Sequence, residues 1–309
     1  MAGSRPGKKK TEKNKTQGRA EASKASASAR SSGVKKKKKK QEPRTAFQHL
    51  QHLSKWVDLI IEVIDARAPL STRHPNSNSI FGNRPRIFVL TKEDLAHLDR
   101  AKKVMGELSR EAGIESILVS LKRTAGRERV INMALEATRE KQESIKRKGL
   151  LERPMRICVV GLPNVGKSSL INWLIGQKKT KTGNRPGITQ GTQWVRVHPK
   201  LELLDTPGIL PVHNFDEQIR LKLASLNLLP QANYQDEQVA ENILAMLKQS
   251  YPQLLDKFVP GLSDAEDGLT LIAEKRNLIG QKATPDRLRA AALLIKDLRS
   301  GNLGRITLD

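Results

Sequence analysis

The sequence predicts an α/β domain with a mainly parallel sheet, followed by a small all-helical domain and preceded by a disordered basic tail. Three observations lead to this prediction. Apolar runs typical of buried strands alternate with helical patterns up to about residue 212. After about Phe215 the strand patterns stop and helical patterns follow. Residues 1–44 hold 16 Lys or Arg against 3 acidic residues and should repel themselves into disorder. We therefore expect units at residues 1–44, 45–212 and 213–309.

The expected elements follow from apolar spacing and from residues that start or stop helices. Strands are predicted at 57–64, 86–90, 117–119, 155–160, 192–197 and 201–204. Helices are predicted at 95–112, 128–147, 169–176, 215–229, 237–258, 265–279 and 285–299. Gly113 and Gly301 should end two of these helices. Thr284 should cap the last helix, with Pro285 at its first helical position.

Composition narrows the class of protein. The chain of 309 residues carries a net charge of +24, which indicates a polyanionic partner, either nucleic acid or an anionic membrane surface. The single cysteine, Cys158, excludes a disulfide scaffold or a Cys-rich zinc module, and its apolar neighbours predict burial. No apolar run approaches the roughly 20 residues of a transmembrane helix. The tail is either a solvated extension or an arm that grips phosphates.

The motif that carries most chemistry is Gly161-Leu162-Pro163-Asn164-Val165-Gly166-Lys167-Ser168, which matches the P-loop pattern. It follows a predicted strand and opens a predicted helix, so its backbone N–H groups should cradle phosphates. Lys167 should neutralise the β- and γ-phosphates, and the Ser168 hydroxyl should bind Mg²⁺. The nucleotide contacts expected in this loop are Asn164, Val165, Gly166, Lys167, Ser168 and Ser169.

A second phosphate motif, Asp205-Thr206-Pro207-Gly208, lies 38 residues after Lys167. Asp205 can hold Mg²⁺ through water, and the Gly208 amide can sense the γ-phosphate. Between the two motifs, Thr189 lies in a basic loop as a further predicted Mg²⁺ ligand. Lys167, Thr189 and Gly208 are the predicted catalytic residues. Ile209 stands where many GTPases carry a glutamine that orients water, so slow intrinsic turnover is expected.

Thr91-Lys92-Glu93-Asp94 is similar to the N/T-K-x-D motif that reads guanine. The Asp94 carboxylate can accept two hydrogen bonds from guanine, and adenine lacks that pair of donors. Lys92 should pack its stem against the base, while Thr91 in place of Asn loses an amide partner. Val119 and Ser120 end the next strand and fit the loop that touches the guanine oxygen. This guanine motif precedes the P-loop, whereas small GTPases have the reverse order, so the motif order is circularly permuted.

Together these segments resemble the circularly permuted GTPases of the YlqF type, the ribosome biogenesis GTPase A family. The similar stretches are Val63–Pro69, Gly161–Ser169, Lys181–Thr189, Leu203–Leu210 and Asn302–Arg305. The resemblance implies a GTPase that acts in late assembly of the large ribosomal subunit, with GTP and Mg²⁺ and with K⁺ held partly by Asn164. It implies a pre-ribosomal particle and its rRNA as partners, a monomer without membrane attachment, and turnover stimulated by the ribosome. The family's aromatic-Pro-Gly-His segment is missing here, since the region reads Gln41-Glu42-Pro43-Arg44.

Other functions remain open at this point. One is a GTP-dependent RNA-binding factor with vestigial hydrolysis, which Ile209 and the missing His motivate. Another is a small-subunit assembly GTPase, although such relatives usually carry a zinc module that one cysteine cannot build. A metabolic P-loop kinase is disfavoured because Thr91–Asp94 specifies guanine. The expected location is a bacterial-type cytoplasm, with an organelle as the alternative.

Overall fold

The fold comes from a computed structural model of the chain, which describes residues 48, 51–52, 54–176, 193–205 and 215–309, with only the backbone of Gln193 and Asp205. The chain divides into Met1–Glu42, outside the described residues, and Pro43–Asp309. The predicted tail, Thr189, Gly208 and the predicted boundary at residue 212 all lie outside the described residues. Residues 45–212 and 213–309 therefore stay a prediction as separate domains.

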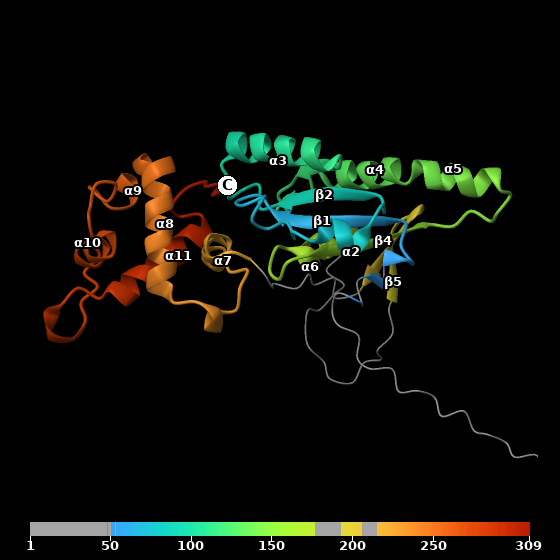
Figure 1. The fold of residues 1–309 in the computed structure, drawn as a ribbon. Helices are drawn as coiled ribbons and strands as arrows, with labels where there is room; N and C mark the ends of the chain where they lie inside the picture. Colours follow the sequence, from blue (N-terminus) through green and yellow to red (C-terminus); the bar gives the residue numbers. More distant parts are fainter. Residues whose placement is uncertain (1–47, 49–50, 53, 177–192, 206–214) are drawn as a thin grey trace, which may run out of the picture. The chain divides into compact units, whose positions relative to one another are not determined.

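A six-stranded sheet forms the centre of the α/β region, in the order β3-β2-β1-β4-β6-β5 (Figure 1). Its strands are β1 (Leu59–Asp65), β2 (Arg86–Thr91), β3 (Glu115–Leu118), β4 (Met155–Gly161), β5 (Gln193–His198) and β6 (Leu201–Asp205). All pairings are parallel except that of the edge strand β5 with β6. This pairing confirms the predicted, mainly parallel sheet. The residues of β1 are all buried, as is typical of a parallel strand that is covered on both faces.

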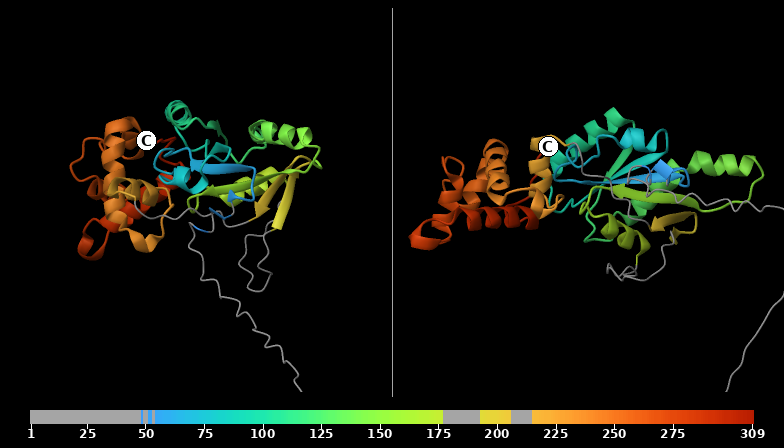
Figure 2. Two further views of the ribbon diagram at one scale, coloured as in Figure 1. Left: turned by 45° about the vertical axis from the view of Figure 1, so that its right-hand side comes forward. Right: turned by 60° about the horizontal axis from the view of Figure 1, so that its bottom comes forward.

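Helices cover both faces of this sheet (Figures 1 and 2). They are α2 (Ser77–Phe81), α3 (Leu98–Ala112), α4 (Arg127–Ala137), α5 (Arg139–Arg147) and α6 (Lys167–Ile175). One face of β1 and β2 presents Ile64, Phe88 and Leu90 to the buried side of α3. The opposite face packs in another apolar cluster with α4 and α6. The sheet is thus a buried scaffold whose strand ends carry the exposed loops.

The second group of helices packs around its own apolar side chains. It comprises α7 (Glu217–Ser225), α8 (Asp236–Ser250), α9 (Pro252–Phe258), α10 (Gly268–Lys275) and α11 (Arg287–Ser300), with short 3₁₀ turns at Gln231–Asn233 and Gln281–Ala283. Ile243 and Leu247 on α8 are fully buried with Leu294 on α11. These helices, coloured orange to red in Figure 2, are called the helical unit below.

Two predicted helices are each broken into two. The predicted 128–147 helix stops at Thr138, where the backbone leaves the helical region and the hydroxyl donates to the Ala134 carbonyl at 2.8 Å. Such a side-chain bond competes with the helical backbone pattern. The predicted 237–258 helix is interrupted at Tyr251, because Pro252 disfavours helical geometry in the residue before it and starts α9 instead.

The predicted start of the last helix is wrong by two residues. Asp286, rather than Thr284, caps α11, and its carboxylate accepts the Arg289 N–H at 3.0 Å. Thr284 and Pro285 instead form a bridge, in which Pro285 lies opposite Ile279. Gly113 and Gly301 end their helices in the left-handed conformation, as predicted. Cys158 is buried, also as predicted. None of the described helices is long and apolar enough to cross a membrane.

One charged side chain, that of Glu62, is buried on a face of the sheet. Glu62, in the middle of β1, is 1% exposed, and the His74 backbone N–H and the Ser77 hydroxyl are the polar groups that face its carboxylate. The nearest counter-charge is Arg86, at 4.0 Å. Burial raises the pKa of Glu62 to about 7, although Arg86 and Arg73 oppose the shift. The folded state therefore holds a proton on Glu62 that the unfolded chain releases near pH 4.5.

This raised pKa predicts a pH-dependent stability. A carboxyl group whose pKa is higher in the folded than in the unfolded chain stabilises the fold, and this stabilisation is complete below the unfolded pKa of 4.5. The stabilisation is lost as pH rises through the folded pKa of about 7. We expect E62Q to match the wild-type chain at pH 4.5 and to exceed it by up to about 3 kcal/mol at pH 8. Denaturant unfolding at several pH values measures the difference. Parallel stability curves for the two proteins would contradict this account.

Candidate nucleotide-binding site

The predicted site residues gather because β1, β2 and β4 end beside one another. The register pairs Asp65 of β1 with Thr91 of β2, and Val63 of β1 with Gly161 of β4. The carboxyl ends of parallel strands meet at one edge of a sheet, which is where open α/β folds bind ligands. The guanine motif and the P-loop, about 70 residues apart in the chain, are therefore neighbours.

The P-loop leaves β4 through a glycine that no other residue can replace without distortion. A Cβ on Gly161 would lie 2.7 Å from the Val63 carbonyl oxygen. Gly166 caps the start of α6 with φ of 107°, a conformation that glycine tolerates best. These glycines let the chain turn sharply from β4 into α6. The loop between the two elements therefore ends at the amino end of α6, where free backbone N–H groups can bind phosphate.

Thr91 ties the guanine motif to the P-loop. Its hydroxyl donates to the Val165 carbonyl at 2.6 Å and lies within 3.3 Å of the place where a Cβ on Gly166 would stand. The sequence suggested that Thr in place of Asn loses an interaction. The structure shows instead that the short hydroxyl fits a buried gap and fixes two nucleotide-binding loops to each other.

Lys167, the first residue of α6, is half-buried and has no acidic partner among the described residues. Its ammonium donates to the Leu162 carbonyl at 2.6 Å. Burial lowers the pKa of Lys167 to about 8. A cation that is under-compensated in this way gains most when a phosphate arrives, because the phosphate supplies the missing counter-charge.

Asp94 and Ser120 also come together as predicted. The Ser120 hydroxyl donates to Asp94 at 2.9 Å, and the exposed Lys122 ammonium lies 2.7 Å from the other carboxylate oxygen. Burial alone would raise the pKa of Asp94, but the hydrogen bonds from Lys122 and Ser120 lower it below its usual value. Asp94 therefore stays ionised and acts only as an acceptor. The Glu93 N–H donates to the Val119 carbonyl at 3.3 Å, which holds the two loops side by side.

Of the predicted Mg²⁺ ligands, the structure describes Ser168 in full and the backbone of Asp205, whereas Thr189 lies outside the described residues. Ser168 is exposed at the start of α6, so its hydroxyl is accessible to a cation, as is that of Ser169. Asp205 ends β6 next to β4, the position predicted from its strand, but only its backbone is described. Within the described part of the chain, no group of three His, Cys, Asp or Glu side chains could hold a metal.

Sequence reasoning missed three residues around this site. Asp65 is fully buried at the end of β1 and lies 2.6 Å from the Lys92 ammonium and 2.9 Å from the Arg67 guanidinium. Asn227, beyond α7, accepts a hydrogen bond from the Asn164 amide at 2.8 Å. The available signal for the first pair was an acid at the end of a buried strand, two residues before an arginine. Nothing in the sequence indicated Asn227.

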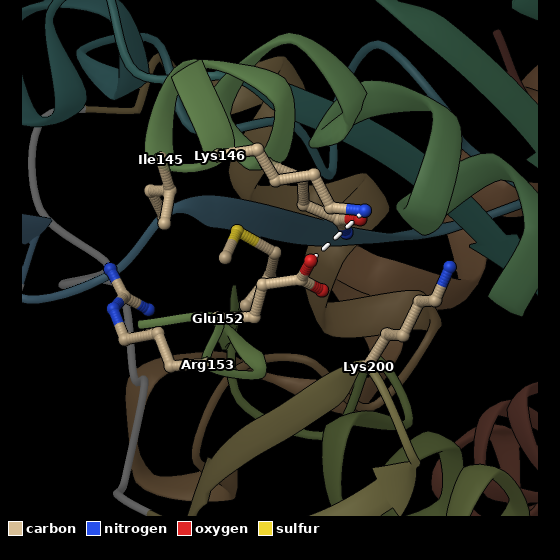
Figure 3. A pocket seen from close by; sticks show the side chains of 7 residues that line it. Ile145, Lys146, Glu152, Arg153 and Lys200 are labelled. Atoms are coloured by element: carbon tan, nitrogen blue, oxygen red, sulfur yellow. Dashed lines mark ion pairs between the residues drawn. The ribbon is translucent and has the colours of Figure 1, made fainter. Parts of the chain in front are cut away.

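A hollow at the opposite end of the sheet is chemically different (Figure 3). Lys146, Arg153 and Lys200 line it near the start of β4 and β6. Lys146 pairs with Glu152 at 3.0 Å, and Arg153 pairs with Asp58 at 2.7 Å. Two of its three cations are thus already neutralised, so this hollow does not compete with the strand-end loops as the nucleotide site.

Comparison with known proteins gives a consistent assignment. A family model described as "50S ribosome-binding GTPase" matches residues 156–272. The ribosome biogenesis GTPase A of Priestia megaterium is 34% identical over 259 residues, covering 82% of this chain and 90% of that protein. The probable ribosome biogenesis GTPase A of Mycoplasma genitalium is 33% identical, covering 84% of this chain and 90% of that protein.

Solved structures agree with these relatives. A GDP-bound YlqF structure superposes with a TM-score of 0.62 at 27% identity, covering 84% of this chain and 98% of that one. A GNP-bound YlqF from T. maritima gives a TM-score of 0.58 at 25% identity, with 85% and 96% covered. The similarity covers most of the chain, and it agrees with the permuted order of the motifs and with their meeting at one edge of the sheet. The chain therefore belongs to the ribosome biogenesis GTPase A (YlqF) family of circularly permuted GTPases and hydrolyses GTP.

Proposed function

We propose that this GTPase acts as a switch in late assembly of the large ribosomal subunit, binding the precursor particle through its rRNA. The observation that carries this proposal is the hydrogen bond between the P-loop Asn164 and Asn227 of the helical unit. It joins the phosphate-binding loop directly to the helical unit, which carries a group of exposed cations near the Ile279–Pro285 bridge. The names of the relatives indicate ribosomal partners for those proteins. We further propose that the chain acts as a monomer in the cytoplasm or its organellar equivalent.

Hydrolysis by this site depends mainly on positioning and charge. Lys167 would leave the Leu162 carbonyl and pair with the β- and γ-phosphates. We propose that Gly208 donates its amide to the γ-phosphate and that Ser168, Thr189 and Asp205 hold Mg²⁺, which neutralises charge as the phosphoryl group transfers. The Asn164 amide already donates to Asn227, so its side-chain oxygen is left to bind K⁺ beside the phosphates.

The RNA-binding part of the proposal concerns the far end of the helical unit. Exposed cations lie around the Ile279–Pro285 bridge, namely Lys275, Arg276, Lys282 and Arg289. Arg305 is exposed nearby in sequence to the end of α11. Arg287 does not belong to this set, because it pairs with Glu241 at 2.8 Å and contacts Asp267 and Glu237. Its charge is thus occupied within the helical unit. The lysine-rich tail would add diffuse, sequence-independent phosphate contacts.

Particle binding tests the proposed switch. We expect the full chain to cosediment with large-subunit precursors more strongly with a non-hydrolysable GTP analogue than with GDP. Replacing Lys275, Arg276 and Arg289 with alanine should reduce that binding at least tenfold, because three phosphate contacts are lost. Lys102→Ala, Lys103→Ala and Arg110→Ala in α3 make a charge-matched control. Binding that ignores both the nucleotide and the helical-unit substitutions would refute the proposal.

Guanine recognition by Asp94 gives a second prediction. In D94N, an amide that donates replaces a carboxylate that only accepts, so the pairing with guanine is lost and pairing with xanthine is gained. We expect GDP affinity to fall at least tenfold and xanthosine diphosphate affinity to rise, measured by calorimetry. D99N, an exposed carboxylate at the start of α3, should bind both nucleotides like the wild type. Equal affinity of the wild type for GDP and ADP would contradict the guanine assignment.

The lowered pKa of Lys167 gives a third prediction. Only the protonated ammonium can pair with phosphate, so GDP affinity should be constant near pH 7 and fall as pH rises above about 8. The expected loss is up to tenfold between pH 8 and pH 9. K167R stays cationic throughout this range and should bind more weakly but without that pH step. A wild-type affinity that is flat from pH 7 to pH 9 would exclude this role for the buried lysine.

A further inference from the structure

The guanine motif is held by a buried carboxylate that the chemistry of GTP binding does not itself require. Asp65 accepts a two-pronged bond from Arg67, with Nε on Oδ1 at 3.0 Å and Nη2 on Oδ2 at 2.9 Å. The same Oδ2 accepts the Lys92 ammonium at 2.6 Å. Burial would raise the pKa of Asp65, but the charges of Arg67 and Lys92 keep it well below its usual range. A fully buried carboxylate with these two cationic partners has a fixed position.

Lys92 is therefore placed before any nucleotide arrives. Its backbone has φ of 63°, which is unusual for a lysine, and its ammonium also lies 3.3 Å from the Asn164 carbonyl of the P-loop. The side chain that should pack against the guanine base is thus bound at its tip by Asp65. Any movement of Asp65 or Arg67 would move the stem of Lys92.

Arg67 reaches in the other direction, toward the helical unit. Its Nη1 donates to the Arg299 carbonyl at the end of α11, at 3.4 Å. The Arg299 guanidinium in turn donates to the Ala224 and Ser225 carbonyls at the end of α7, at 2.7 and 3.0 Å. The chain then continues to Asn227, which accepts the Asn164 amide. These hydrogen bonds, together with the backbone from Ser225 to Asn227, link the guanine motif through the helical unit to the P-loop. We call this route the polar path.

The last residues of the chain reinforce the same junction. The Leu308 N–H donates to the Arg67 carbonyl at 2.6 Å, and the Ile306 N–H donates to the carbonyl of Leu95, next to Asp94, at 3.1 Å. The Asp309 carboxylate accepts from the Ser71 hydroxyl at 2.6 Å and from Lys222 of α7 at 2.9 Å. The β1 loop, the guanine motif and α7 therefore share one terminal segment.

We propose that Asp65 and Arg67 are positioning residues that couple the hold of Lys92 on guanine to the docking of the helical unit. Nucleotide binding holds Lys92 and Asn164, the two ends of the polar path, in the positions that they already occupy, and so strengthens the contacts made by α11 and α7. Coupling between two sites is reciprocal, so docking of the helical unit must raise nucleotide affinity by the same factor. The inference rests on guanine-nucleotide binding at this site and adds a route by which the helical unit responds to it.

Arg67→Met is the informative substitution, because Asp65 keeps Lys92 as its counter-ion while the link to α11 is lost. We expect R67M to bind a fluorescent GDP five- to fifty-fold more weakly, within the range common for coupled sites. R67K, which retains a cation near Asp65, should recover part of that affinity. Arg153→Met is the matched control, since Arg153 forms a similar fork on Asp58, at 2.7 and 3.0 Å, at the other end of the sheet. R153M should bind GDP like the wild type.

Hydrogen exchange supplies a readout that simple loss of stability would not reproduce. In the wild type, GDP should slow exchange of the Ile306 and Leu308 amides, by the factor that R67M loses in affinity. In R67M, GDP should have little effect on these amides. Unchanged exchange in the wild type on adding GDP, or wild-type GDP affinity in R67M, would overturn the coupling. A wild-type chain that binds no GDP would refute the guanine assignment itself, and with it the coupling.

The substitution Lys222→Met tests the same coupling if R67M does not fold. Lys222 is partly exposed on α7, and among the described residues its ammonium reaches the loop after β1 through Asp309, which binds Ser71. Coupling predicts that K222M weakens GDP binding two- to ten-fold and reduces the GDP-dependent protection of Ile306 and Leu308. Wild-type values for both measurements would overturn the proposal.

Discussion

The parallel register of β1, β2 and β4 is the constraint on which this molecule depends. Pairing Asp65 with Thr91 and Val63 with Gly161 places three loops at one edge, whatever their order in the chain. A parallel sheet specifies which strand ends are neighbours but not which strand comes first. The permuted motif order therefore leaves the nucleotide site intact, because the spatial contacts survive while the connections between strands change. What the permutation alters is which segments are covalently joined to the site.

The sequence predicted the parts of the fold that follow from apolar pattern and from local backbone chemistry. Buried strands, the P-loop turn and the glycine ends of α3 and α11 all have such signatures, and the structure confirms them. It did not predict the break at Thr138, because a helix-compatible pattern continues across that residue and only the folded geometry directs its hydroxyl back to Ala134. The start of α11 was misplaced for a similar reason. Thr284 and Asp286 are both good caps, and the bridge between Ile279 and Pro285 selects the second.

The same distinction applies to the site. Residue types that match a motif, such as Lys167, Asp94 and Ser120, could be predicted as site residues from spacing alone, and the structure brings Asp94 and Ser120 together. Partners contributed by distant segments could not, because Asp65, Arg67 and Asn227 acquire their roles from tertiary contacts. Thr91 shows how a motif can mislead: compared with asparagine it reads as a weaker residue. In the structure, its buried hydroxyl donates to the Val165 carbonyl and so joins the guanine motif to the P-loop.

Because the motif order is permuted, the helical unit follows β6 in the chain, the strand that ends at Asp205. Two of its polar links to the nucleotide loops run to backbone carbonyls, those of Arg299 and Asn227. Each such hydrogen bond contributes only about 1 kcal/mol net, so no single link locks the arrangement. The buried Asp65 is different, since its removal would leave two cations, Arg67 and Lys92, without their counter-charge. The junction thus combines one fixed ionic centre with several hydrogen bonds that can each be broken at small cost.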